Sequence, residues 1–212
     1  VDEVQDYDAF QLAYLKFCFP RAKFTLLGDL NQAIFTHENR KKLLKELGTM
    51  FDPEKTSVVQ LTKSYRSTKE ITDFTREILL DGEAIEAFDR PGELPEVIIN
   101  NSQAGAVQDV MKTLQKYQDQ HDKIAVIGKT LADSQEISEQ LKQQGIDNTL
   151  IRTENQRLVD GIIVVPSYLA KGLEFDAVVV WDANDNKYHE EDERQLLYTI
   201  ASRAMHALTI TA

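Results

Sequence analysis

An acidic pair at the start of the chain has the residue types and spacing for phosphate chemistry. Asp2 and Glu3 directly follow Val1, and Gln5 comes two residues later. At the end of a buried strand, an Asp can hold Mg²⁺ through a water, and an adjacent Glu can polarise an attacking water. Acidic pairs are also common in turns, so a solvated turn is the alternative interpretation.

A second polar segment follows the apolar run over residues 24–27. Gly28 and Asp29 form a predicted turn, and Gln32 lies three residues after Asp29. Ligands of parallel α/β sheets bind at the carboxyl edge, where a glutamine can sense a terminal phosphate. The alternative is a plain Gly-Asp turn with Gln32 in solvent.

A third segment combines an aromatic residue with an arginine. Tyr65 and Arg66 precede a helical pattern over residues 69–79, which Ser67 or Thr68 is predicted to cap. The pair would provide an aromatic plate beside a bidentate phosphate ligand. Alternatively, Tyr65 belongs to a core and Arg66 pairs with a surface acid.

Two more polar segments lie towards the carboxyl terminus. Gly172 follows Lys171 between two strong strand patterns, and Glu174 comes two residues later. A glycine at that point allows a ligand to approach the backbone closely. Arg203 follows an amphipathic segment that begins at Glu193. An arginine off the apolar stripe of a helix is usually solvated.

The elements that must position these residues alternate between strand and helix. Runs rich in Val and Ile, as in parallel strands covered on both faces, span residues 24–27, 58–61, 97–99, 124–127, 162–165, 177–181 and 208–211. Helical patterns cover residues 104–117, a segment that contains Ile137 and Leu141 and ends near Gly145, and residues 196–204. This alternation predicts an α/β fold, with a doubly wound parallel sheet and helices on both faces.

A domain boundary is predicted between about Thr49 and Lys63, around the turn at Asp52 and Pro53. Residues 1–55 supply too few strands for a complete sheet, whereas residues 56–212 supply enough for a whole α/β domain. The chain does not begin with Met, and Val1 resembles the last residue of a strand whose body is absent. We therefore expect a fragment of a longer protein.

Composition limits the classes of function. The 24 basic and 35 acidic residues give a net charge of −11, which repels a phosphate backbone unless positive charge is gathered locally. No apolar run reaches the ~18 residues of a membrane span, and the first residues do not resemble a signal peptide. We therefore expect a cytoplasmic protein. A single cysteine excludes an internal disulfide, and four scattered histidines do not favour a zinc site.

The five polar segments occur together and in order, and they resemble motifs II to VI of the UvrD/Rep-type superfamily 1 DNA helicases. The matching stretches read DExQD, GDxxQAIF, YRS, AKGLEF and E…LLY…SRA. The wording of residues 166–175 most resembles the HelD (helicase IV-like) branch. The resemblance implies that residues 1–55 are the remnant of a first RecA-like (P-loop NTPase-type) motor domain. Residues 56–212 would be the second RecA-like domain.

The resemblance also implies roles in binding and hydrolysing ATP with Mg²⁺. Asp2 would help to coordinate Mg²⁺, and Glu3 would be the general base. Gln32 would contact the γ-phosphate and couple its loss to motion. The other implied roles are a stack near the adenine for Tyr65, a γ-phosphate contact for Arg66, a ribose site at Gly172 and Glu174, and an arginine finger across the cleft for Arg203.

The sequence departs from that family in its nucleotide-binding half. No Gly-x-x-x-x-Gly-Lys-Ser/Thr loop occurs, so the phosphate cradle is missing. We therefore expect this chain to be inactive as an ATPase when alone, with the missing N-terminal half as its partner. Residues 80–160 leave no space for the large accessory domain that UvrD/Rep enzymes insert.

It also departs at residues that would bind nucleic acid. Phe35 and His37 stand where UvrD/Rep enzymes have an aromatic pair, which weakens a stacking platform worth about 1–3 kcal/mol per base. Pro166 and Tyr168 occupy the usual Thr and His positions of the AKGLEF segment. Tyr168 could stack on a base or pack within the chain.

The leading hypothesis is a C-terminal fragment of an ATP-dependent DNA helicase or translocase that moves on single-stranded DNA. The alternative is an ATP-driven RNA polymerase-remodelling factor of the HelD type with little or no unwinding activity. The charge of −11 and the weakened stacking platform favour this alternative. A third hypothesis is a catalytically silent scaffold, against which the presence of Asp2, Glu3, Gln32, Arg66 and Arg203 argues.

Overall fold

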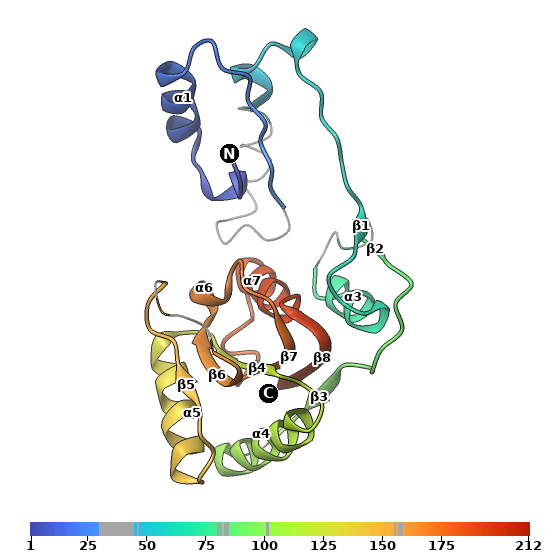
Figure 1. Ribbon diagram of the computed structural model, residues 1–212, viewed down its shortest axis with the longest axis vertical. Helices are drawn as coiled ribbons and strands as arrows, with labels where there is room; N and C mark the ends of the chain where they lie inside the picture. Colours follow the sequence, from blue (N-terminus) through green and yellow to red (C-terminus); the bar gives the residue numbers. More distant parts are fainter. Residues whose placement is uncertain are drawn as a thin grey trace. The chain divides into compact units, whose positions relative to one another are not determined.

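The computed structural model divides the chain into two compact units, Val1–Leu61 and Thr62–Ala212 (Figure 1). It describes residues 1–29, 45, 47–79, 82, 85–100, 102–154, 156 and 159–212. The predicted boundary falls after residue 55, whereas the compact units divide after Leu61.

The first unit is built on an extended segment that pairs with the start of the chain. The N-terminal amine of Val1 donates to the carbonyl oxygen of Thr25 at 2.8 Å, and the Leu27 N–H donates to the carbonyl of Val1 at 2.9 Å. The Val4 N–H in turn donates to the carbonyl of Leu27 at 2.9 Å. Residues 24–27 were predicted as a strand; they are extended and paired, but they lack the ladder of an assigned strand.

Short helices follow this pairing. A 3₁₀ helix spans Val4–Asp6, and α1 spans Ala9–Cys18. Asp8 caps α1, because its carboxylate accepts the Gln11 N–H at 2.7 Å while the Gln11 side chain accepts the Asp8 N–H at 2.9 Å. Val4 and Leu12 are the buried residues of a small apolar cluster. A further 3₁₀ helix spans Pro53–Lys55.

The second unit contains a six-stranded sheet in the order β3-β8-β7-β4-β6-β5. Its strands are β3 (Glu96–Ile98), β4 (Lys123–Gly128), β5 (Thr149–Leu150), β6 (Gly161–Pro166), β7 (Phe175–Val180) and β8 (Ala204–Thr211). Every neighbouring pair is parallel. A separate parallel pair joins β1 (Lys63–Ser64) to β2 (Glu86–Ala87). The predicted α/β class with a parallel sheet is confirmed.

Helices cover both faces of the sheet (Figure 1). One face packs against α4 (Gln103–Gln118) and α5 (Leu131–Gln143); the other packs against α3 (Lys69–Arg76), α6 (Ser167–Ala170) and α7 (Glu191–Ala201). The alternation along β4 explains this division. Ile124 and Val126 enter the α4–α5 core, whereas Ala125 and Ile127 enter the core on the other face. Both sets are fully buried, which accounts for the unbroken apolar runs.

One strand prediction is wrong, and the capping prediction for α3 is confirmed only in the position of Thr68. Residues 58–61 do not form a strand; they are extended and exposed. Neither Ser67 nor Thr68 caps α3 through its side chain: Thr68 is the N-cap residue but makes no cap hydrogen bond. The Ser67 hydroxyl instead donates to the carbonyl of Ala204 at 2.5 Å, and the Thr68 N–H donates to the carbonyl of Met205 at 3.2 Å. Contacts with β8, rather than capping, thus fix the start of α3.

Within the described ranges, no helix is long and apolar enough to cross a membrane.

Candidate functional site

The predicted site residues of the second unit gather at the amino edge of its sheet. Glu174 directly precedes β7 and Arg203 directly precedes β8. The two strands are adjacent, and the Phe175 N–H donates to the carbonyl of Arg203 at 3.1 Å. The Thr68 contact with Met205 brings the Tyr65–Arg66 segment to the same edge. Ligands of open parallel sheets usually bind at the carboxyl edge, so this cluster lies at the opposite end of the strands.

Arg66 and Glu174 form an ion pair within this cluster. The Nε of Arg66 lies 2.6 Å from Oε1 of Glu174, and the two side chains are 34% and 48% exposed. Arg66 does pair with an acid, as the alternative interpretation expected, but that acid is another predicted site residue. Because the pair is solvated, it contributes only about 0–1 kcal/mol to folding. Both side chains therefore remain available to a ligand.

Tyr65 is an exposed aromatic residue beside this pair. Its side chain is 63% exposed, so the interpretation of Tyr65 as a core residue is wrong. The ring lies 5.0 Å from the ring of Phe88 at a tilt of 39°, and the Lys63 ammonium lies 5.3 Å from the centre of the Phe88 ring. This platform can stack on a planar base.

Arg90 joins the cluster, although no motif contains it. Its Nη2 donates to the carbonyl oxygen of Arg66 and, at 3.1 Å, to that of Met205. Arg90 thereby ties the backbone of Arg66 to the start of β8. The residue lies in a stretch of the sequence without a periodic apolar pattern. Only long-range contacts reveal its role.

Gly172 and Arg203 differ in how well the sequence anticipated them. Gly172 has φ +78, a left-handed conformation that favours glycine, as a close backbone turn requires. The alternative interpretation placed Arg203 in solvent, but Arg203 is only 1% exposed. Its Nε donates to the carbonyl of Thr199 at 2.9 Å, one turn back on α7. Arg203 is buried because it packs against α7, a contact that the amphipathic pattern of the sequence did not reveal.

The remaining predicted site residues belong to the first unit. The Glu3 N–H donates to Oδ1 of Asp2 at 2.9 Å, and Glu3 itself has φ 50 and ψ 46, a left-handed conformation. The Gln5 side chain donates to the Glu3 carboxylate and accepts the Asp29 N–H. Gln32 lies outside the described residues, as do Phe35 and His37.

Two family models match the chain, and both are described as the UvrD-like helicase C-terminal domain. One matches residues 59–158 and the other residues 161–211. Among solved structures, the chain is similar to the C-terminal domain of a possible DNA helicase from Lactobacillus plantarum WCFS1. The two are 52% identical with a TM-score of 0.62, and the match covers 70% of this chain and 87% of the other.

This chain belongs to the UvrD-like helicase C-terminal domain family. A comparison with curated proteins found no match. The family models begin at residue 59 and end at residue 211, so they cover the whole amino-edge cluster of the second unit.

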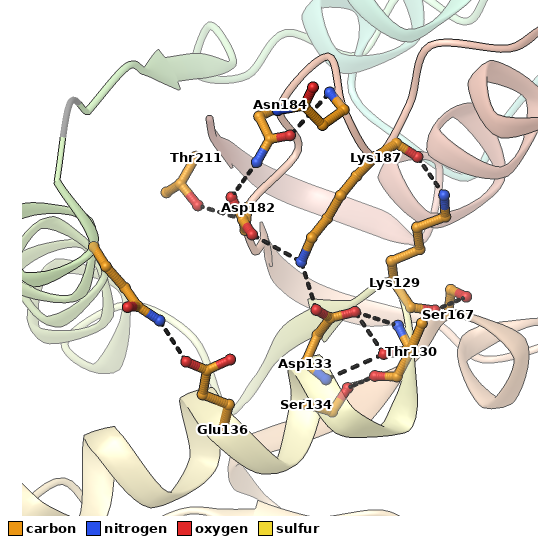
Figure 2. A network of polar contacts seen from close by, with 12 residues as sticks. Lys129, Thr130, Asp133, Ser134, Glu136, Ser167, Asp182, Asn184, Lys187 and Thr211 are labelled. Atoms are coloured by element: carbon orange, nitrogen blue, oxygen red, sulfur yellow. Dashed lines mark hydrogen bonds and ion pairs between the residues drawn. The ribbon is translucent and has the colours of Figure 1, made fainter.

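The helicase domain has a second polar cluster at the opposite, carboxyl edge of its sheet (Figure 2). Lys187 lies 2.5 Å from Oδ1 of Asp133 and 2.7 Å from Oδ2 of Asp182. The Lys129 ammonium pairs with Glu193 and donates to the carbonyl of Lys187. These contacts join the loop after β7 to the amino ends of α5 and α7.

Charge pairing governs protonation in this carboxyl-edge network. Burial raises the pKa of Asp133, but hydrogen bonds from Lys187 and Thr130 outweigh it and hold that pKa below its usual value. Hydrogen bonds from the Glu190 backbone and from Lys129 lower the pKa of Glu193. Burial raises the pKa of the Tyr188 hydroxyl. Because both lysines are mostly buried and paired with carboxylates, this edge is a poorer site for a phosphate than the more exposed Arg66–Glu174 pair.

Proposed function

We propose that this chain is part of an ATP-dependent DNA helicase or translocase, in which ATP hydrolysis drives movement on single-stranded DNA. The observation that carries the proposal is the amino-edge cluster, where exposed Tyr65, the Arg66–Glu174 pair and Arg203 converge. An aromatic plate, a guanidinium and a ribose acceptor are the groups that a nucleoside triphosphate requires.

The residues of this cluster would act by positioning and by neutralising charge, without covalent chemistry. Tyr65 would stack near the adenine, and Arg66 would leave Glu174 to reach the γ-phosphate. Glu174, beside Gly172, would then accept a hydrogen bond from the ribose. Arg203 would supply an arginine finger, a group worth about 10³–10⁵ in rate in related phosphoryl transfer. Because Arg203 is buried, its guanidinium must leave α7 to do so.

The first unit would supply the groups that act on the attacking water. Glu3 would serve as general base, and Gln32 would contact the γ-phosphate. Asp2 suits Mg²⁺, because it is an exposed carboxylate and Mg²⁺ is usually held by one or two carboxylates together with waters and phosphate oxygens. Across the described part of the chain, no group of three or more His, Cys, Asp or Glu could hold a metal ion. Bound Mg²⁺ would neutralise developing phosphate charge.

An alternative function is ATP-driven remodelling of RNA polymerase, as in the HelD branch. The carboxyl edge favours it, because the loop after β7 and the start of α7 carry a dense set of acids, namely Asp182, Asp185, Glu190, Glu191, Asp192 and Glu193. An acidic edge repels nucleic acid and attracts a basic protein surface.

The test is ATP turnover by the longer protein that joins this chain to a phosphate-binding half, titrated with single-stranded DNA. Strong stimulation by DNA supports the helicase or translocase. Turnover that ignores DNA but responds to RNA polymerase supports the remodeller. No turnover under either condition contradicts both.

A further inference from the structure

Gln5 lies between the two polar segments of the first unit and contacts both. Its side chain is 5% exposed. Nε2 donates to Oε2 of Glu3 at 2.5 Å, and Oε1 accepts the Asp29 N–H at 3.2 Å. A carboxamide has both donors and an acceptor, so one side chain can hold a carboxylate and a backbone N–H together.

Gly28 has no side chain, and this leaves the space that the Gln5 side chain occupies. A Cβ on Gly28 would lie 2.4 Å from Oε1 of Gln5 and 2.8 Å from Cγ1 of Val4. Such distances are well inside van der Waals contact, so any side chain at residue 28 would displace Gln5. The glycine is therefore needed for space.

Glu3 requires an external restraint for its carboxylate. Its backbone is left-handed, which is uncommon for a residue with a side chain and stores of order 1 kcal/mol. A long, partly exposed acidic side chain has several rotamers, and a general base must point closely at its water. The hydrogen bond from Gln5 restricts the direction of that carboxylate.

We propose that Gln5 is a positioning residue that orients Glu3 and ties it to the Gly28–Asp29 turn. The inference rests on the proposed function, in which Glu3 is the general base.

Two isosteric substitutions separate the two contacts of Gln5. Gln5→Glu keeps an oxygen for the Asp29 N–H but replaces the donor to Glu3 with a repelling carboxylate. Gln5→Met removes both contacts at nearly the same volume. Gln11→Glu is the matched control, since Gln11 lies in the same unit and a glutamate maintains its capping box.

The first readout is amide hydrogen exchange of Asp29 in the 212-residue chain. We expect exchange to accelerate about tenfold or more in Gln5→Met and to remain near wild type in Gln5→Glu and Gln11→Glu. Unchanged exchange in Gln5→Met would show that the contact is absent in solution and would overturn the inference. This readout does not depend on ATP hydrolysis.

The second readout is steady-state ATP hydrolysis by the longer protein. We expect kcat to fall about 10–100-fold in Gln5→Glu and Gln5→Met, while affinity for a non-hydrolysable ATP analogue changes little. Gln5→Met is the decisive variant, because Gln5→Glu also places a second carboxylate in a nearly buried site and is expected to lower the unfolding temperature. Gly28→Ala, which displaces Gln5 without altering it, is expected to reproduce the loss. Activity of the wild type reports on the proposed function. If the wild type is active and Gln5→Met retains kcat within about twofold, the inference fails.

Discussion

At the level of single residues, the amino-edge cluster contains two guanidinium groups that are hydrogen-bonded before any ligand binds. Arg66 is held by Glu174, and the Nε of Arg203 is held by the carbonyl of Thr199. A phosphate competes for both guanidinium groups, because charge-assisted hydrogen bonds to phosphate are strong. Because the Arg66–Glu174 pair is partly exposed, replacing it by contacts with a ligand costs little free energy.

Glu174→Gln separates ligand binding from folding at this pair. In the longer protein, we expect the KM for ATP to rise about tenfold, since one hydrogen bond to a charged group is worth roughly 1.5 kcal/mol. The unfolding temperature should remain unchanged because the pair is exposed. Glu93→Gln, which breaks the similarly exposed pair with Lys116, is the control. An equal rise in KM for both variants would remove Glu174 from the site.

Lys187→Met tests the carboxyl-edge network through its pH dependence. Lys187 is 26% exposed and lies between Asp133 and Asp182, so its loss should lower the free energy of unfolding by about 1–2 kcal/mol near pH 7. The pKa of Asp133 is lowered, so its stabilisation is present above its ordinary pKa of about 3.9 and is lost as pH falls through the lowered value.

The pKa of Lys187 is raised, despite burial, by hydrogen bonds to Asp133 and Asp182. Its stabilisation is therefore present below about pH 10.4 and is lost as pH rises through the raised value. Urea unfolding should show a large difference between wild type and Lys187→Met at pH 7 and a small one at pH 3. An equal difference at both pH values would exclude the ion pairs as its cause. Lys112→Met, in an exposed pair with Asp109, is the neutral control.

At the level of elements, hydrophobic periodicity predicted most of the second unit. The strand runs near β3, β4, β6, β7 and β8 and the helices α4, α5 and α7 were all expected, because each buries a regular face. The two-residue strand β5 was missed, since Thr149 and Leu150 form too short a run to show a period. Residues 58–61 show the reverse error: a β-rich run forms no strand where no partner strand accepts its hydrogen bonds.

The end of α5 provides a prediction on this scale. Gly145 has φ +79 after the last turn of the helix, and a Cβ at this position would meet no atom within 4 Å. Gly145→Ala should therefore destabilise the unit through backbone strain alone, by about 1 kcal/mol. Gly145→Asn should lose less, because asparagine tolerates the left-handed region. Equal losses in thermal unfolding would point to a cause other than φ.

Site residues were only partly predictable, because contacts between residues far apart in the chain leave no local pattern in the sequence. Motif residues Arg66, Glu174 and Arg203 could be named from spacing, and the structure brings them to one edge of the sheet. Arg90 could not be named, because a hydrogen bond to a distant carbonyl leaves no local pattern. Gln5 stood inside a motif, but its contact with Asp29 depends on the pairing of the chain's start with residues 24–27.

At the level of the whole molecule, a net charge of −11 opposes contact with nucleic acid, whose phosphate backbone is also negative. Charge repulsion by the acidic carboxyl edge predicts weak autonomous binding of the chain to single-stranded DNA. We also expect no ATP hydrolysis by the 212-residue chain alone, because its sequence has no glycine-rich loop to cradle the phosphates. Robust Mg²⁺-dependent turnover by the purified chain, absent from an Arg203→Ala preparation, would contradict this expectation.

The most direct test of the account is Arg203→Ala in the longer protein, with kcat and the affinity for a non-hydrolysable ATP analogue measured together. Arg203→Lys serves as a companion that keeps the charge, because Arg203 is buried and its truncation also affects folding. We predict that hydrolysis falls about 10³-fold or more while analogue binding stays nearly intact. Turnover comparable to wild type would remove Arg203 from the site and contradict a nucleotide site at the amino edge of the sheet.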